Sequence, residues 1–197
     1  MPAIGYAAGM TDARPAETSK ADWIALAVQL LRREGPASLT VERLCSRAKR
    51  NEAAFRLYFK GIGSLALALA EHWTGAEARI AAHAAQSEGP PMQRLMALLS
   101  LSGVSDPALD RGVRALAADY AEIADIVRAA DDRREMVVSA MLAEVYGIKG
   151  DEARAFGRLF NALHLAAMTR PEGEGAAYAE QPASALTAML GSNFPID

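Results

Sequence analysis

The 197-residue chain contains a single cysteine, Cys45. One cysteine cannot form an internal disulfide bond, and it excludes a zinc site built from several thiolates. No apolar run approaches the roughly 18 residues that cross a bilayer, and the first residues lack the basic-then-apolar pattern of a secretory signal. We therefore expect a cytoplasmic protein without a membrane partner, in which Cys45 is a small buried side chain rather than a reactive thiol.

Aromatic residues are also scarce, at 6% of the chain, although 51% of all residues are hydrophobic. The core must therefore be built mainly from Ala, Leu, Val and Met, which favour or accept helices. Gly and Pro residues separate about nine apolar segments of helical period. These features predict an all-α fold.

Charge is unevenly distributed along the sequence, although the net charge is only -3. Residues 20–60 carry nine Lys or Arg and four Asp or Glu, whereas the rest of the chain carries twelve and twenty. A basic module followed by an acidic one is typical of a protein with a polyanion-binding head and a separately charged body.

Three helical segments are predicted within the basic module. The first follows the candidate N-cap Ser19 and ends at Gly35, the second follows Thr40, and the third follows Asn51. Two short helices joined by about three residues, after a longer helix, form a helix-turn-helix. The apolar residues at helical spacing, which we expect to be buried, are Trp23, Ile24, Ala27, Leu30, Leu31, Val41, Leu44, Cys45, Phe55, Tyr58 and Phe59.

The same residues resemble the N-terminal domain of TetR-family transcriptional regulators. The resemblance lies in the A…LL…EG pattern of the first helix, the TV..L…A pattern of the second and the YF…..L pattern that closes the third. Residues 113–147 and 153–166 are similar to the ligand-binding and dimerisation half of that family. The resemblance therefore covers nearly everything after a Gly-, Pro- and Ala-rich leader.

The resemblance implies a homodimeric, ligand-responsive regulator that binds a double-stranded DNA operator, most simply as a repressor. The titratable residues form no reaction centre, so we expect no enzymatic activity and no cofactor. The later helices are poor in aromatic residues and contain methionines, which predicts a cavity for a small apolar or amphipathic ligand. The composition of the leader predicts that residues 1–18 are disordered, with Met10 as an alternative start. The resemblance divides the rest into a helix-turn-helix domain (19–63) and a ligand-binding and dimerisation domain (64–197).

The predicted DNA-binding residues include several departures from the family's pattern. Lys49 stands where the family usually has Gly, which predicts a left-handed backbone at the turn, and Arg50 replaces a core apolar residue. Glu52 and Ile62 replace common lysines, and Arg56 replaces a tyrosine. The full predicted set is Thr40, Lys49, Arg50, Asn51, Glu52, Arg56, Tyr58 and Lys60.

These DNA-binding candidates have different expected roles. Arg50, Arg56 and Lys60 are expected to contact phosphates, whereas the carboxylate of Glu52 opposes one. Asn51 either caps the third helix or reads an adenine edge. Because these departures fall where DNA is contacted, a relative that has lost DNA binding and regulates through protein contacts remains the alternative.

Candidate ligand-pocket residues lie on the later helices. Methionine adapts to varied apolar ligands, although ordinary core packing is the alternative. We expect no cluster of convergent charges on these helices, because the acidic and basic residues at 131–134 fit helix-surface or inter-helix ion pairs. The candidate pocket residues are Met92, Met96, Tyr120, Met136 and Met141.

Two apolar faces near the C-terminus predict a dimer interface. Helical spacing on the last two segments suggests that they pair across a two-fold axis as a four-helix bundle. The residues are Phe156, Leu159, Phe160 and Leu163 on one segment and Leu186, Met189 and Leu190 on the other.

Three further features of the sequence do not predict a cofactor, metal or catalytic site. Residues 61–66, GIGSLA, fit the glycine pattern of a dinucleotide-binding turn, but the long segment after them is helical and no second strand follows. His72 and His83 lie about three helical turns apart, too far to share a metal. His164 lies among apolar residues, where packing is favoured over a role as general base.

Overall fold

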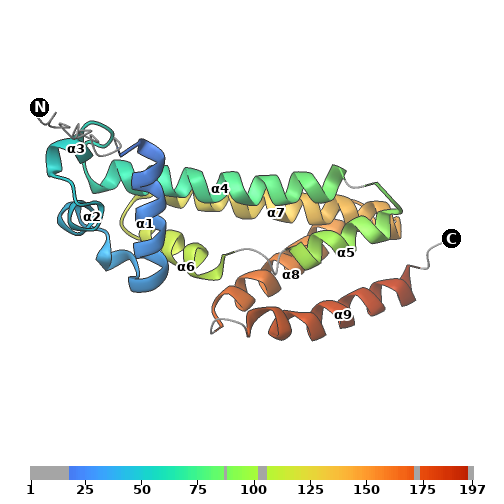
Figure 1. Ribbon diagram of the computed structural model, residues 1–197. Helices are drawn as coiled ribbons and strands as arrows, with labels where there is room; N and C mark the ends of the chain where they lie inside the picture. Colours follow the sequence, from blue (N-terminus) through green and yellow to red (C-terminus); the bar gives the residue numbers. More distant parts are fainter. Residues whose placement is uncertain (1–17, 87, 102–105, 171–173, 195–197) are drawn as a thin grey trace, which may run out of the picture.

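The computed structural model describes residues 18–86, 88–101, 106–170 and 174–194. Throughout these ranges the regular structure is helical and no strand is present, which confirms the predicted all-α fold with nine α-helices (Figure 1). All of the predicted leader except Thr18 lies outside the described residues. The helices are α1 Lys20–Glu34, η1 Pro36–Ser38 (a 3-10 turn), α2 Val41–Ala48, α3 Glu52–Arg56, α4 Ile62–Gln86, α5 Pro91–Leu101, α6 Pro107–Leu116, α7 Ala121–Tyr146, α8 Gly150–Met168 and α9 Gly175–Asn193.

Local signals in the sequence fix several helix ends. The hydroxyl of Ser19 accepts a hydrogen bond from the amide of Asp22 at 3.2 Å, and the Asp22 carboxylate accepts one from the Ser19 amide at 2.8 Å. This capping box satisfies two amides at the start of α1. Asp106 caps α6 in front of Pro107, and Gly147 is the C-cap of α7. Pro182 lies inside α9.

The helix-turn-helix occupies one end of an elongated molecule (Figure 1). Helices α4 and α7 run side by side along the body, and α6 lies between the body and α1. Helix α8 packs against α7, and α9 packs against α8 on the opposite side of the molecule from α4. The body thus connects the helix-turn-helix to α8 and α9 through α4, α6 and α7.

Two hydrophobic clusters hold the described chain together. The first joins α1–α3 to the neighbouring parts of α4, α6 and α7, and in it the ring of Trp23 meets that of Phe55 edge-to-face at 5.4 Å. Cys45 is buried in this cluster, and burial followed by the charge of Glu52 raises the pKa of its thiol. Because this cluster crosses the predicted boundary at residue 63, the helix-turn-helix shares its core with the body.

The second cluster lies at the other end, between α5, α7, α8 and α9, and includes Leu95, Leu142 and Phe160. Helices α7 and α8 approach closely at Gly157, where a Cβ atom would lie 2.0 Å from the hydroxyl oxygen of Ser139. Only the absence of a side chain allows this approach. No described helix is long and apolar enough to cross a membrane.

Candidate functional site

The helix-turn-helix has a regular backbone in spite of its unusual turn. The hydroxyl of Thr40 caps α2 by accepting from the amide of Arg43 at 3.2 Å, and the side-chain oxygen of Asn51 caps α3 by accepting from Ala54 at 3.0 Å. Lys49 lies between the helices with φ 53° and ψ 44°, which confirms the predicted left-handed position. A non-glycine residue in this conformation costs about 1 kcal/mol.

A shallow groove of about 380 Å³ follows the outer face of this turn. It brings together four of the predicted DNA-binding residues, whereas Thr40, Glu52, Arg56 and Lys60 lie outside its lining. Half-buried Arg50 donates from Nε to the hydroxyl of Thr18 at 2.9 Å, so its guanidinium is directed toward the segment before α1. The groove is lined by Thr18, Lys49, Arg50, Asn51, Ala54, Leu57 and Tyr58.

Tyr58 does not lie on the buried face of the third helix as predicted. Helix α3 ends at Arg56, so helical spacing no longer determines the direction of the residues that follow. Phe59 is buried, but Tyr58 is 38% exposed and Leu57 is 73% exposed. Leu57 was not among the DNA-binding candidates predicted from the sequence. Its only signal in the sequence is that it is apolar and lies next to the predicted buried face of the third helix.

The exposed cations of the helix-turn-helix are partly neutralised within the chain. Arg56 donates to the Glu52 carboxylate at 2.8 Å and to the backbone carbonyl of Lys60 at 2.6 Å. Arg43 and Arg47 both form ion pairs with Glu34. Because exposed ion pairs contribute about 0–1 kcal/mol each, a phosphate can replace these carboxylates at little cost.

The five predicted pocket residues do not converge on one cavity. Met96 and Met136 are 47% and 64% exposed, whereas Met141 is buried in the second hydrophobic cluster and Met92 packs against it. Tyr120 packs against the first cluster, near Gly63. Helical spacing predicts which residues share one face of a helix, but it does not predict which neighbouring helix covers that face.

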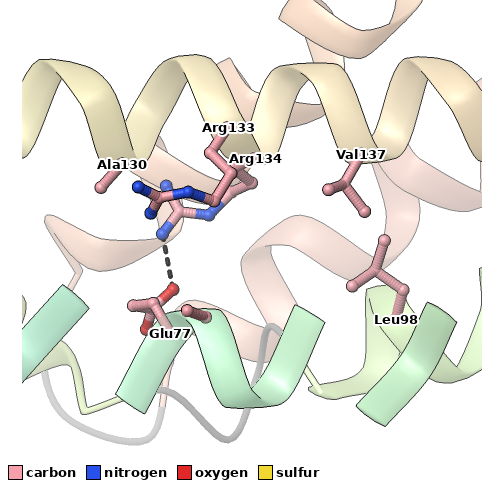
Figure 2. A pocket seen from close by; sticks show the side chains of 7 residues that line it. Glu77, Leu98, Ala130, Arg133, Arg134 and Val137 are labelled. Carbon is pink, nitrogen blue, oxygen red and sulfur yellow. Dashed lines mark hydrogen bonds and ion pairs between the residues drawn. The ribbon is translucent and has the colours of Figure 1, made fainter. Parts of the chain in front are cut away.

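A small pocket between α4, α5 and α7 lies elsewhere (Figure 2). Its volume is about 40 Å³, which is room for a few water molecules. Arg133 and Arg134 enter it from α7 and Glu77 enters it from α4, while Leu98 and Val137 lie at its other end. The remaining lining residues are Ala78 and Ala130.

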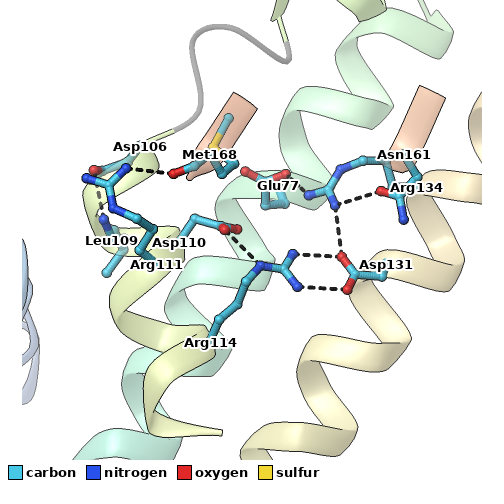
Figure 3. Close-up of polar contacts among 10 residues, drawn as sticks. All are labelled: Glu77, Asp106, Leu109, Asp110, Arg111, Arg114, Asp131, Arg134, Asn161 and Met168. Carbon is cyan, nitrogen blue, oxygen red and sulfur yellow. Dashed lines mark hydrogen bonds and ion pairs between the residues drawn. The ribbon is translucent and has the colours of Figure 1, made fainter. Parts of the chain in front are cut away.

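A network of ion pairs connects α4, α6 and α7 beside this pocket (Figure 3). Arg114 donates to both oxygens of Asp131 at 2.7 and 2.8 Å and to Asp110 at 2.8 Å. Arg134 donates to Asp131 at 3.0 Å and to Glu77 at 2.6 Å. The expectation that these helices lack convergent charges is therefore wrong, although an inter-helix role for Asp131 and Arg134 is confirmed.

Burial makes this network costly to disrupt. Asp110 is only 1% exposed, and one of its carboxylate oxygens has no hydrogen-bond partner among the described residues. Burial opposes the charge of Asp131, but the hydrogen bonds and charges of Arg114 and Arg134 outweigh it and lower the pKa of the carboxyl. Burial likewise opposes the charge of Arg114, but Asp131 and Asp110 raise the pKa of its guanidinium.

His164 is buried beside this network on α8. Burial, followed by the charges of Arg134 and Arg114, lowers the pKa of its imidazole to about 3. The ring is therefore neutral at neutral pH, in keeping with the predicted packing role. His72 and His83 are exposed, and no three His, Cys, Asp or Glu side chains gather as metal ligands in the described part of the chain.

The glycines of the GIGSLA segment lie at the start of a helix and not after a strand. Gly61 precedes α4 and Gly63 lies in its first turn, and the residues before them form α3 and a turn. The structure therefore contradicts the dinucleotide-binding interpretation of this segment.

The predicted dimer residues divide between the protomer's own core and its surface. Phe160 and Leu190 are buried in the second hydrophobic cluster, and so are not available to a partner. Leu159 and Met189 are 47% and 46% exposed. Phe156, Leu163 and Leu186 are half-buried.

No protein-family model matches the sequence, and no curated protein matches it. Among solved structures, a transcriptional regulator from Rhodococcus sp. Rha1 superposes with a TM-score of 0.73 at 18% identity, covering 91% of this chain and 100% of that one. A regulator of the TetR/AcrR family from Thermobifida fusca gives 0.63 at 17% identity, with 87% and 95% covered. AibR, in complex with isovaleryl coenzyme A and operator DNA, gives 0.65 at 14% identity, with 90% and 99% covered. The chain has the fold of the TetR/AcrR-family transcriptional regulators.

Proposed function

We propose that this chain is a TetR-family transcriptional regulator that binds operator DNA through α2 and α3. The observation that carries the proposal is the capped helix-turn-helix, with Lys49, Asn51 and Tyr58 lining an outward groove at one end of the molecule. A helix-turn-helix places its second helix in the major groove, and cations around that helix position it on the phosphates. Regulators that share the fold support the same assignment.

We further propose that the protein is a homodimeric repressor whose operator affinity falls when a small ligand binds the body. AibR, which has the same fold, is found with both an acyl coenzyme A and operator DNA. A ligand that binds better to the state whose recognition helices no longer match successive major grooves shifts the protein toward that state. Neither catalysis nor a cofactor is part of this proposal.

The second candidate function is regulation through protein contacts without DNA binding. Leu57 is 73% exposed next to Tyr58, and an exposed apolar pair suits a protein partner as well as a thymine methyl group. Glu34 and Glu52 also pair with cations that would otherwise face phosphates. Salt-dependent DNA affinity separates the two candidates.

The Arg56→Ala variant tests the phosphate contact directly. Each phosphate contact contributes about 0.9 to the slope of log affinity against log salt, so the variant should lower the slope by about that amount per protomer. Glu52→Gln should strengthen binding to every duplex, because it removes the carboxylate that holds Arg56. Fluorescence anisotropy with labelled duplexes at several salt concentrations measures both effects.

The control for this test is Arg128→Ala, since Arg128 is an exposed, ion-paired arginine on α7, outside the helix-turn-helix. It should leave the slope unchanged. A wild-type protein without salt-dependent affinity for any duplex would exclude DNA binding and favour the protein-binding candidate.

The proposed dimer uses the outer faces of α8 and α9. Leu159 and Met189 are exposed there. A surface groove of about 490 Å³ on α9 is lined by four small side chains together with Glu180 and Gln181, and the small side chains allow close helix approach. Ala185→Arg places a charge in that groove and should convert a dimer into a monomer in light scattering at micromolar concentration. Ala129→Arg, an exposed alanine on α7, should remain dimeric. A monomeric wild type would contradict the proposal.

A further inference from the structure

The pocket between α4, α5 and α7 is amphipathic (Figure 2). Two guanidinium groups, from Arg133 and Arg134, and one carboxylate, from Glu77, stand at one end. The other lining residues are all apolar: Ala78, Leu98, Ala130 and Val137. The lining therefore carries one net positive charge next to an apolar wall.

The two arginines of the pocket differ in how they are paired. Arg134 is 13% exposed and donates to Glu77 at 2.6 Å, with Asp131 and Asn161 as further acceptors. Asp131 also forms an ion pair with Arg114, so its negative charge is already balanced within the network. Arg133 is exposed and forms no ion pair within the described ranges. The lining therefore has one carboxylate for two guanidinium groups, and an incoming anion would supply the second negative charge.

We propose that this pocket binds a monoanionic amphiphile, namely a carboxylate with an apolar tail. The ligand carboxylate takes the place of Glu77 on Arg134, Glu77 turns to Arg133, and the tail lies against Leu98 and Val137. One added anion brings the charge of the lining to zero, whereas a cation would add a like charge and a neutral molecule would leave the positive charge uncompensated. The proposal rests on the ligand response proposed above and specifies its chemistry.

Binding of this kind would change the contact between α4 and α7. The present volume of about 40 Å³ accepts a head group but not a tail, so the helices must separate to admit the ligand. The Glu77–Arg134 pair joins α4 to α7 directly over the pocket, and α4 leads back to the helix-turn-helix. Exchange of carboxylates on Arg134 thus replaces the Glu77–Arg134 link between α4 and α7 with one from Glu77 to the exposed Arg133, one position earlier on α7.

Isothermal titration of the full-length protein without DNA tests the ligand class. Butanoate, octanoate and decanoate are compared with 1-octanol and octylamine. Octanoate should bind at least about tenfold more tightly than 1-octanol or octylamine, because a charge-assisted hydrogen bond is roughly twice as strong as a neutral one. Affinity should also rise from butanoate to decanoate, as the tail buries more apolar surface.

Three variants locate the carboxylate. Arg133→Gln should weaken octanoate binding by about tenfold, and Glu77→Gln should strengthen it by removing the competing carboxylate. Arg128→Gln, on the solvent-exposed side of the same helix, should bind octanoate as the wild type does. Thermal unfolding confirms that each variant is folded. If Glu77 had only a structural role, Glu77→Gln would not raise the affinity for octanoate.

The proposal is wrong if no carboxylate binds more tightly than 1-octanol, or if Arg133→Gln binds octanoate with wild-type affinity. DNA affinity is measured separately on the ligand-free protein. Absence of octanoate binding in a protein that binds DNA overturns the ligand class alone. Octanoate binding in a protein without DNA affinity overturns the DNA-binding function alone.

Discussion

The Arg114→Met variant is expected to lose about 3–5 kcal/mol of unfolding free energy, which is the usual cost of removing one partner from a buried ion pair. The substitution leaves Asp110, which is 1% exposed and already has one oxygen without a partner, with no hydrogen bond to its other oxygen. It also removes both hydrogen bonds from Arg114 to Asp131. Chemical denaturation at pH 7 measures the loss.

Arg128→Met is the matched control, because Arg128 is an arginine in an exposed ion pair with Asp125. An exposed pair contributes about 0–1 kcal/mol, so this variant should remain close to the wild type. If Arg114→Met costs no more than Arg128→Met, the network of α4, α6 and α7 does not stabilise the fold.

The stability lost in Arg114→Met should depend on pH, in a direction that the pKa of Asp131 determines. The pKa of Asp131 is lower in the folded protein than in the unfolded chain, where it is about 3.9. A lowered pKa contributes stability above the unfolded value, and this contribution disappears as the pH falls through the folded value. The stability difference between wild type and Arg114→Met should therefore be largest near neutral pH and smaller near pH 3.

The fold was predictable where neighbouring residues in the chain determine it. Ser19, Thr40 and Asn51 are N-caps whose side chains accept hydrogen bonds from amides three residues later, so the starts of α1, α2 and α3 follow from sequence. The left-handed position of Lys49 was predicted from the resemblance, because Lys49 stands where the TetR family usually has Gly. Each of these signals acts within one helical turn, and no tertiary contact is needed to interpret it.

The candidate ligand site was not predictable, because it depends on which helix faces meet. Asp110 and Arg114 are four residues apart and Asp131 and Arg134 are three apart, which is also the spacing of ordinary exposed ion pairs. Only the packing of α6 against α4 and α7 turns these charges inward. For the same reason Met136 was expected in a pocket although it is 64% exposed.

The second large effect is expected at Gly112, where α6 meets α1. A Cβ atom at this position would lie 2.4, 2.8 and 2.9 Å from three side-chain carbons of Leu31. Leu31 is only 2% exposed and is enclosed in the first hydrophobic cluster, so it has no space into which to move. Gly112→Ala should therefore lower the free energy of unfolding by about 1–3 kcal/mol, although Gly to Ala within a helix ordinarily gains about 0.5–1 kcal/mol.

The matched control for Gly112→Ala is Gly75→Ala on α4, where an added Cβ would meet only the end of the Arg79 side chain at 3.6 Å. Denaturation curves should show a stabilised Gly75→Ala and a destabilised Gly112→Ala. Because α6 also pairs with α1 through Asp106 and Arg32, displacement of α6 should tilt the helix-turn-helix and weaken operator binding at temperatures where the variant is fully folded. Wild-type stability and wild-type DNA affinity in Gly112→Ala would together show that the contact between α1 and α6 does not hold the DNA-binding end in place.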